Sequence, residues 1–141
     1  MIEGDITYRI PNHDGWGYLT VNQPNQHRSE WELVDIAVVP QRSGLGCRLI
    51  RMFCDDHPCN TKVCGPIGHD DSFAAVDKLD YHAPPGESRS FWLDDTEIIR
   101  TIPIFAFLDV SGISVTRVKI TCDHSILGNP QIYMQYYGHT K

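Results

Sequence analysis

The stretch that decides the fold reads Glu32-Leu33-Val34-Asp35-Ile36-Ala37-Val38-Val39-Pro40-Gln41-Arg42-Ser43-Gly44-Leu45-Gly46. The apolar run over residues 30–39 predicts a buried strand, and Pro40 favours an extended backbone at the residue before it. After the two glycines, apolar residues recur at helical spacing, at Leu45, Leu49, Ile50 and Phe53. We therefore expect a strand, a tight turn and a helix, with backbone N–H groups of the turn available to an anion such as phosphate.

The neighbouring segments extend this unit in both directions. Ahead of it, alternating patterns predict strands over 5–10 and 16–21. Behind it, the helix ends before Pro58, and a short strand over 61–65 closes a strand–helix–strand unit, whose two strands pair in parallel. A second helix is expected over 72–79, capped by Asp70 or Asp71. Further strands are expected over 88–93, 98–108, 113–121 and 132–137.

This order of elements predicts one α/β (α+β) domain over residues 1–141. Its sheet is expected to be mixed and mostly antiparallel, with one parallel pair, flanking helices and a β-rich C-terminal third. Within the expected strand over 98–108, the segment 100–108 is apolar enough to form a central strand or the seam of a homodimer. Pro103 inside that run disfavours a fully paired central strand.

Composition limits which binding partners and which cellular compartment we expect. A length of 141 residues suits a single hydrophobic core, and a net charge of −6 without a Lys/Arg run argues against a nucleic-acid partner. No window approaches the 18 apolar residues of a membrane span, so no membrane partner is expected. The N-terminus lacks a signal-peptide pattern, and the five cysteines are an odd number. Both features favour a reducing, cytoplasmic location.

Four potential zinc ligands are close in sequence: Cys54, His57, Cys59 and Cys64. They contain no Cys-x2-Cys pair, and they straddle the expected end of a helix. Ordinary buried thiols are the favoured interpretation, so no metal is expected.

Two segments carry a resemblance to a known family. Gln41-Arg42-Ser43-Gly44-Leu45-Gly46, after Val38-Val39-Pro40, resembles the acyl-CoA-binding motif of the GNAT N-acyltransferase superfamily, Gln/Arg-x-x-Gly-x-Gly/Ala. Val76-Asp77-Lys78-Leu79-Asp80-Tyr81 is similar to a later pattern of that family, Tyr-x-Lys-Leu-Gly-Phe. The resemblance covers residues 30–81, whereas the strands over 88–137 are poorly matched. A Walker loop is absent, and a single Gly-x-Gly is weak evidence for a dinucleotide fold.

The resemblance implies a GNAT-like domain that binds acetyl-CoA as acyl donor where two parallel strands splay apart. Loop N–H groups would hold the pyrophosphate, with glycines where a side chain would block its approach. A strand N–H would polarise the thioester carbonyl. The implied cofactor-binding residues are Ile36, Ala37 and Val38 on the strand, Gln41, Arg42, Ser43, Gly44, Leu45, Gly46 and Cys47 at the loop, and His69 after the second strand.

The resemblance also implies a catalytic base and a catalytic acid. Glu32 is the candidate base and Asp35 the alternative, although a solvated strand edge would equally explain Glu32. Strand alternation predicts that the two carboxylates lie on opposite faces, so that only one faces the split. The tyrosine that the family uses as acid falls at Val76, which cannot donate a proton. Tyr81 is the nearby candidate, with a packed core aromatic as its other interpretation.

Three functions follow from these patterns. The first is an acyl-CoA-dependent N-acyltransferase that moves an acetyl group to an amine acceptor, a small molecule or a protein. The acidic net charge favours basic acceptors. The second is a non-catalytic acyl-CoA-binding module that has lost its acid. The third is an interaction protein in which the glycines serve only the turn.

Overall fold

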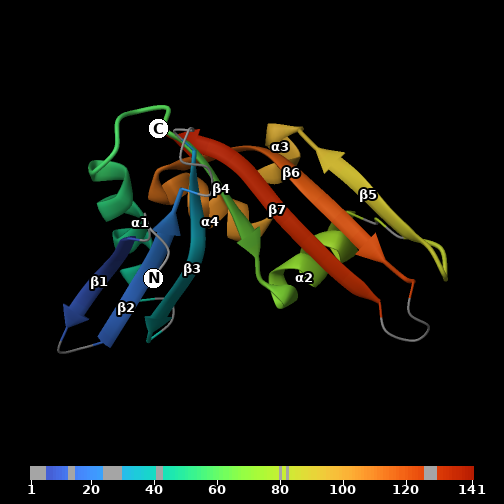
Figure 1. Cartoon of the computed structure of the whole chain (residues 1–141), viewed down its shortest axis with the longest axis horizontal. Coiled ribbons are helices and arrows are strands. Elements are labelled where there is room, and N and C mark those ends of the chain that lie inside the picture. Colours follow the sequence, from blue (N-terminus) through green and yellow to red (C-terminus); the bar gives the residue numbers. More distant parts are fainter. Residues whose placement is uncertain are drawn as a thin grey trace.

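The computed structural model of the chain describes residues 6–12, 15–23, 30–40, 43–79, 81, 83–125 and 130–141 (Figure 1). The strands are β1 (Ile6–Asn12), β2 (Gly15–Asn22), β3 (Trp31–Val39), β4 (Lys62–Ile67), β5 (Ser88–Leu93), β6 (Ile113–Asp123) and β7 (Gln131–Thr140). The helices are α1 (Leu45–Asp55), α2 (His69–Leu79), α3 (Thr96–Ile99) and α4 (Pro103–Ser111).

All seven strands belong to one mixed sheet with the order β1-β2-β3-β4-β7-β6-β5. Only β3 and β4 pair in parallel, and the other pairings in the described part of the chain are antiparallel. The expected mixed α/β architecture, with a mostly antiparallel sheet and one parallel strand–helix–strand unit, is therefore confirmed. The last strand in sequence, β7, enters the middle of the sheet beside β4.

The expected strand over 98–108 is wrong, because this segment forms α3 and α4. The Asp95 side chain accepts hydrogen bonds from the first N–H groups of α3. Pro103 is the first residue of α4, where a missing N–H group costs nothing, and Gly112 ends that helix at a φ of 115°. A short apolar run fits a buried helix as well as a buried strand, so periodicity alone could not separate them.

A smaller correction concerns α2. The helix begins at His69 rather than at Ser72. Asp70 and Asp71 consequently lie inside its first turn and do not precede it as caps.

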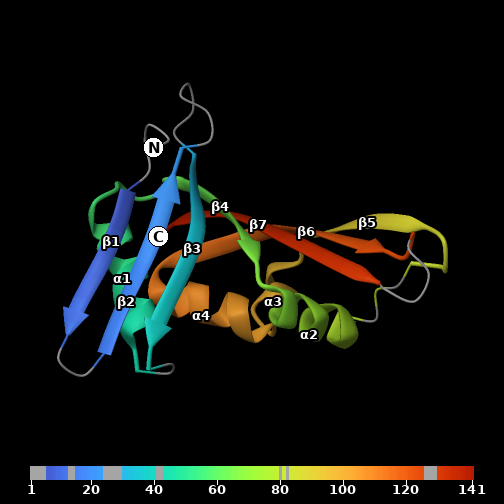
Figure 2. The same ribbon diagram turned by 60° about the horizontal axis from the view of Figure 1, so that its bottom comes forward.

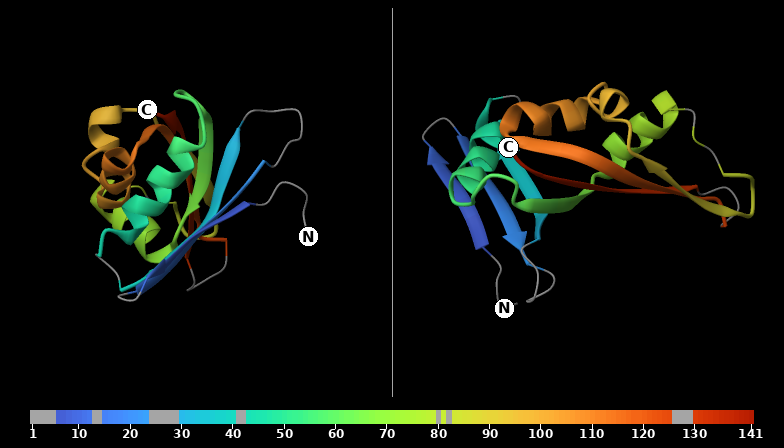
Figure 3. Two further views of the ribbon diagram at one scale, coloured as in Figure 1. Left: turned by 90° about the vertical axis from the view of Figure 1, so that its left-hand side faces the viewer. Right: turned by 90° about the horizontal axis from the view of Figure 1, so that it is seen from above.

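The four described helices lie on one side of the sheet (Figures 2 and 3). Buried side chains point toward them, for example Leu19, Val118, Ile120 and Met134. The opposite side carries Tyr18, Glu32, Cys64, Tyr137 and Arg117, as the strand registers show. We call this second side the bare face, because no described helix covers it.

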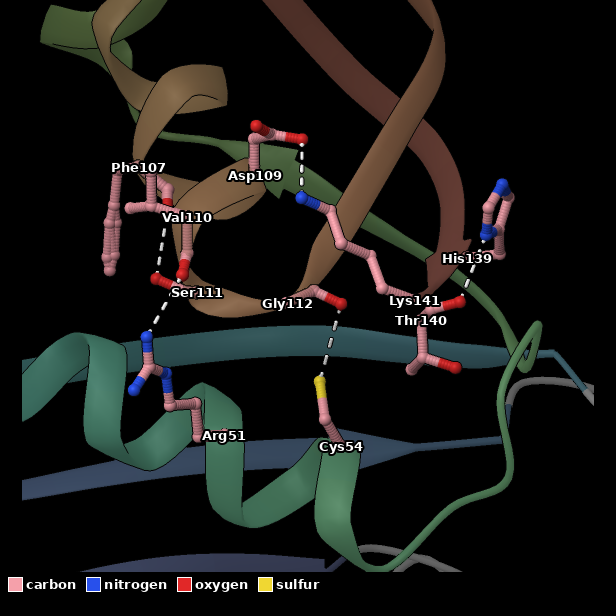
Figure 4. Close-up of polar contacts among 10 residues, drawn as sticks. All are labelled: Arg51, Cys54, Phe107, Asp109, Val110, Ser111, Gly112, His139, Thr140 and Lys141. Carbon is pink, nitrogen blue, oxygen red and sulfur yellow. Dashed lines mark hydrogen bonds and ion pairs between the residues drawn. The ribbon is translucent and has the colours of Figure 1, made fainter.

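Helices α1 and α4 are joined by polar contacts as well as by packing (Figure 4). The Arg51 guanidinium donates to the Val110 carbonyl at 3.3 Å, and the Cys54 thiol lies 3.7 Å from the Gly112 carbonyl oxygen. These contacts fix α4 against α1 on the helical side of the sheet. None of the helices in the described ranges combines the length and apolar character needed to cross a lipid bilayer.

Candidate functional site

The two parallel strands separate almost as soon as they meet. β3 and β4 pair only at Trp31–Val63 and Glu32–Cys64. Beyond that point β3 stays with β2 and β4 stays with β7, so the strands diverge toward their carboxyl ends (Figure 1). Among the described residues, no strand pairs with the edge of β3 over residues 33–39 that faces β4. Its alternate N–H and C=O groups are available to a ligand.

A β-bulge lies at the start of this free edge. Val21 pairs with Leu33 and Thr20 pairs with Asp35, which leaves Val34 as the extra residue. Glu32 and Asp35 therefore project on the same side of the sheet, the bare face. The expectation of opposite faces is wrong, because it assumed an uninterrupted two-residue alternation and a bulge adds one residue.

A cleft of about 360 Å³ occupies the split. One wall is formed by Val34, Asp35 and Ile36 of β3, and the other by residues 66–68 at the end of β4. Further lining comes from Ile50, Ile104, Leu108 and Tyr136. A mostly apolar cleft of this size with a few polar groups is typical of a small-ligand site.

Helices α1 and α2 both begin at the open end of the split, where ligands bind in open α/β sheets. The N-cap of α1 is Gly44, which offers no side-chain hydrogen bond, and the first turn contains no acidic residue. The first turn of α2, by contrast, carries Asp70 and Asp71. The positive end of the α1 dipole is therefore the better place for a phosphate.

The two glycines of the turn have different roles within the protein. Gly44 has a φ of +83°, a left-handed conformation that favours glycine, and a Cβ there would meet nothing within 4 Å. A Cβ on Gly46 would lie 3.2 Å from the Phe107 ring of α4. Gly46 thus allows α1 and α4 to pack closely, a role that the sequence pattern did not indicate.

The remaining loop candidates are only partly described. Gln41 and Arg42 lie outside the described residues, as does the side chain of His69. The Ser43 hydroxyl donates to the Pro40 carbonyl at 2.6 Å, which tightens the turn before α1. Leu45 is buried against the core, and Cys47 is half-buried in the first helical turn. Ala37 and Val38 lie on the free edge of β3 beyond Ile36.

The structure locates Tyr81 away from the split. Its ring stacks on Phe91, with centroids 4.8 Å apart and planes 14° from parallel. It lines a different cavity, together with Phe73 and Val76 of α2. The cleft touches α2 only near its N-terminus, at Asp71.

Tyr136 of β7 is the hydroxyl that sequence reasoning missed. Its side chain is 3% exposed and lines the cleft. A Cβ on Gly65 would come within 2.8 Å of the Tyr136 hydroxyl oxygen and 2.9 Å of the Leu33 carbonyl oxygen. The hydroxyl thus lies at the apex of the split, where β3 and β4 stop pairing. Burial raises the pKa of Tyr136, and the neighbouring Cys64 and Glu32 raise it further, so the phenol keeps its proton at neutral pH.

The two carboxylates near the apex differ in their surroundings. Asp35 accepts a hydrogen bond from the Tyr18 hydroxyl at 2.8 Å. Glu32 is half-buried opposite Cys64 and Asn22, and Oδ1 of Asn22 is buried without a hydrogen-bond partner among the described residues. No hydrogen bond joins the Glu32 carboxylate to another residue in the described ranges, so two neighbouring acceptors here suit an N–H donor.

Because of Cys64, the free energy of unfolding should depend on pH in the alkaline range. Burial raises the pKa of its thiol from 9.0 to about 12, with Glu30 and Glu32 as smaller contributors. Between those values the unfolded chain loses this proton and the folded chain keeps it. The free energy of unfolding should therefore fall as pH rises through this window, by up to about 1.4 kcal/mol per pH unit from this group.

Urea unfolding at several pH values above 9 would measure this effect. Cys64→Ser should show a shallower alkaline loss than the wild type, whereas Cys59→Ser, at an exposed position, should follow the wild type. Equal slopes for wild type and Cys64→Ser would contradict the assignment.

The apex itself should tolerate no added side chain. Gly65→Ala would force a methyl group against the backbone of Leu33 and the Tyr136 hydroxyl. We expect a loss of about 1–3 kcal/mol in the free energy of unfolding, as for other overpacked sites. Gly68→Ala is the matched control, since a Cβ there meets nothing within 4 Å. Equal stabilities of the two variants in chemical denaturation would contradict the apex geometry.

In the described ranges, no three His, Cys, Asp or Glu side chains converge as they would around a metal ion. Cys54, Cys59 and Cys64 are half-buried, exposed and buried respectively. Comparison with known proteins adds no assignment: no protein-family model, no curated protein and no solved structure matches this chain.

Proposed function

We propose that this chain is an acyl-CoA-dependent N-acyltransferase of the GNAT type, which transfers an acetyl group from acetyl-CoA to an amine. The observation that carries the proposal is the parallel pair β3–β4, which splits after Glu32–Cys64 over an apolar cleft. The N-terminus of α1 begins at the open end of that split. The resemblance of residues 30–81 to the GNAT motifs supports the same function.

The donor would bind along three features of this site. N–H groups in the first turn of α1, over residues 45–47, suit the pyrophosphate. The free edge of β3 offers strand-like hydrogen bonds to the amide groups of the pantetheine arm, and Ile36, Ile104 and Leu108 offer apolar contacts. Acetyl-CoA supplies the acyl group as a thioester.

The chemistry needs one base and one acid. As the amine nitrogen forms a bond to the thioester carbon, Glu32 takes the proton that the nitrogen loses. As the carbon–sulfur bond breaks, Tyr136 donates its proton to the departing sulfur. A free N–H of β3 stabilises the negative charge on the carbonyl oxygen. Glu32 acts from the bare face and Tyr136 from the helical face, with the side-chain-free Gly65 beside the apex.

A negative charge introduced at position 44 gives the sharpest test of acetyl-CoA binding. Asp and Asn both tolerate the left-handed conformation, both have open space at this position, and they differ only in charge. At about a hundred times the dissociation constant, acetyl-CoA should stabilise the wild type by roughly 2.7 kcal/mol. We expect Gly44→Asn to keep most of this stabilisation and Gly44→Asp to lose it, because the carboxylate repels the phosphates.

Thermal unfolding with and without acetyl-CoA measures both variants. If millimolar acetyl-CoA leaves the wild type unshifted, the proposal is overturned. If Gly44→Asp responds as strongly as Gly44→Asn, the phosphates do not bind at α1. Binding without release of thiol in the presence of amines would instead favour the non-catalytic binding module.

A further inference from the structure

The bare face carries charges of opposite sign along one row across the sheet. Glu32 on β3 is opposite Cys64 on β4, Cys64 is opposite Tyr137 on β7, and Tyr137 is opposite Arg117 on β6. Neighbouring strands lie about 4.8 Å apart, so the acidic and basic ends of this row are separated by about 14 Å.

The basic end is built around one indole ring. The Arg117 guanidinium carbon lies 4.0 Å from the centroid of the Trp92 ring, and the Lys119 ammonium lies 5.8 Å from it. Both side chains are exposed, and neither reaches a carboxylate within ion-pair distance in the part of the chain that the structure describes. In a protein with a net charge of −6, two cations held together without a carboxylate partner form a ready anion site.

A hollow adjoins Lys119 on the same side. It measures about 490 Å³ and is lined by Lys119 together with Thr121, Tyr133 and Gln135. The hollow thus offers hydroxyl and amide groups on the residues next to Lys119, which gives an anion additional hydrogen-bond donors.

Tyr137 connects the two ends of the row electrostatically. Burial raises its pKa, and Cys64, Glu30 and Glu32 raise it further, whereas Arg117 lowers it. The phenol thus lies within range of both the acidic and the basic end. A ligand lying along the row would contact all three groups.

We propose that the acceptor is a short peptide segment whose amine lies at Glu32 and whose carboxylate lies at Arg117 and Lys119. This inference rests on the proposed function, which assigns the amine to Glu32. An extended peptide spans at most about 3.3–3.6 Å per residue, so about four residues bridge the row. The acceptor is accordingly zwitterionic, which refines the basic acceptor that net charge alone favours.

Transfer rates to synthetic peptides test this inference. The probes are glycine–alanine peptides of two to six residues with a free N-terminal amine, each made with a C-terminal carboxylate and with a C-terminal carboxamide. We expect the carboxylate to raise kcat/KM by roughly five- to tenfold over the carboxamide, as for charge-assisted hydrogen bonds near a surface. The preference should peak near four residues and be weak at two.

Three variants and one further peptide sharpen the result. The double variant Arg117→Gln/Lys119→Gln should lose the preference, and Arg117→Lys should keep part of it. Lys62→Gln, which removes an exposed cation of the bare face outside this row, should keep all of it. An amidated peptide with an acidic fourth residue shows whether a side-chain carboxylate replaces the terminal one. Equal rates for carboxylate and carboxamide at every length would overturn the inference.

Binding without acetyl-CoA separates this inference from the proposed function. The four-residue carboxylate peptide should shift the Trp92 indole N–H resonance, and the carboxamide should not. If the Trp92 resonance shifts but no acetyl group is transferred, the proposed anion site stands and the proposed transferase activity is overturned. Transfer without a shift and without a carboxylate preference would retain the transferase and overturn the anion site.

Discussion

Replacing Tyr136 with phenylalanine should lower kcat by roughly 10²–10⁴-fold, the usual contribution of a positioned proton donor. The hydroxyl lies at the apex of the split, and burial raises its pKa, so it holds a proton throughout the physiological range. Removing one oxygen atom leaves the ring and its packing in place. The loss should therefore appear in kcat, with little change in KM for acetyl-CoA.

Tyr81→Phe is the matched control for this experiment. Tyr81 also carries a phenol, but its ring stacks on Phe91 and lines a different cavity from the cleft in the split. Its substitution should leave kcat near the wild-type value. If Tyr136→Phe kept more than half of the wild-type kcat, the departing sulfur would receive its proton from another group.

Replacing Glu32 with glutamine should lower kcat/KM by a similar factor, roughly 10²–10⁴-fold, at neutral pH. Glutamine has nearly the same shape, but it cannot take a proton from the attacking amine. The deficit should narrow as pH rises, because a growing fraction of the amine then loses its proton to water. A pH–rate profile of wild type and variant measures this convergence.

Asp35→Asn is the comparison for Glu32→Gln. The Asp35 carboxylate is engaged by the Tyr18 hydroxyl, so its replacement should cost much less activity. The reverse result, with a large loss for Asp35→Asn and a small one for Glu32→Gln, would assign the base to Asp35.

The central unit could be predicted from sequence because its signals are local. The strand ending at Val39, the glycine turn, the apolar spacing of α1 and the following strand all lie within residues 30–67. The bulge at Val34 could not be predicted, because it depends on the register that β3 adopts against β2. Helix α4 was missed because its first six residues, 103–108, are all apolar, so no polar residue among them marks one face.

The candidate site also combines residues that the sequence could predict with residues that it could not. Glu32 and the turn at Gly44 were found because they lie within one continuous motif. Tyr136 was missed because β7 comes last in sequence and enters the sheet beside β4. Alternation over 132–137 could have indicated that Met134 and Tyr136 share a buried face. It could not have indicated that this face meets the apex of the split.

Hydrogen–deuterium exchange with and without acetyl-CoA tests for an acyl-CoA site in the split, because it reports on the free edge of β3 itself. In the free protein, the unpaired N–H groups over residues 33–39 and those in the first turn of α1 should exchange quickly. Saturating acetyl-CoA should slow exchange in both segments, and Gly44→Asp should abolish the slowing at α1. Unchanged exchange over residues 33–39 and 45–47 at millimolar acetyl-CoA would contradict an acyl-CoA site in the split.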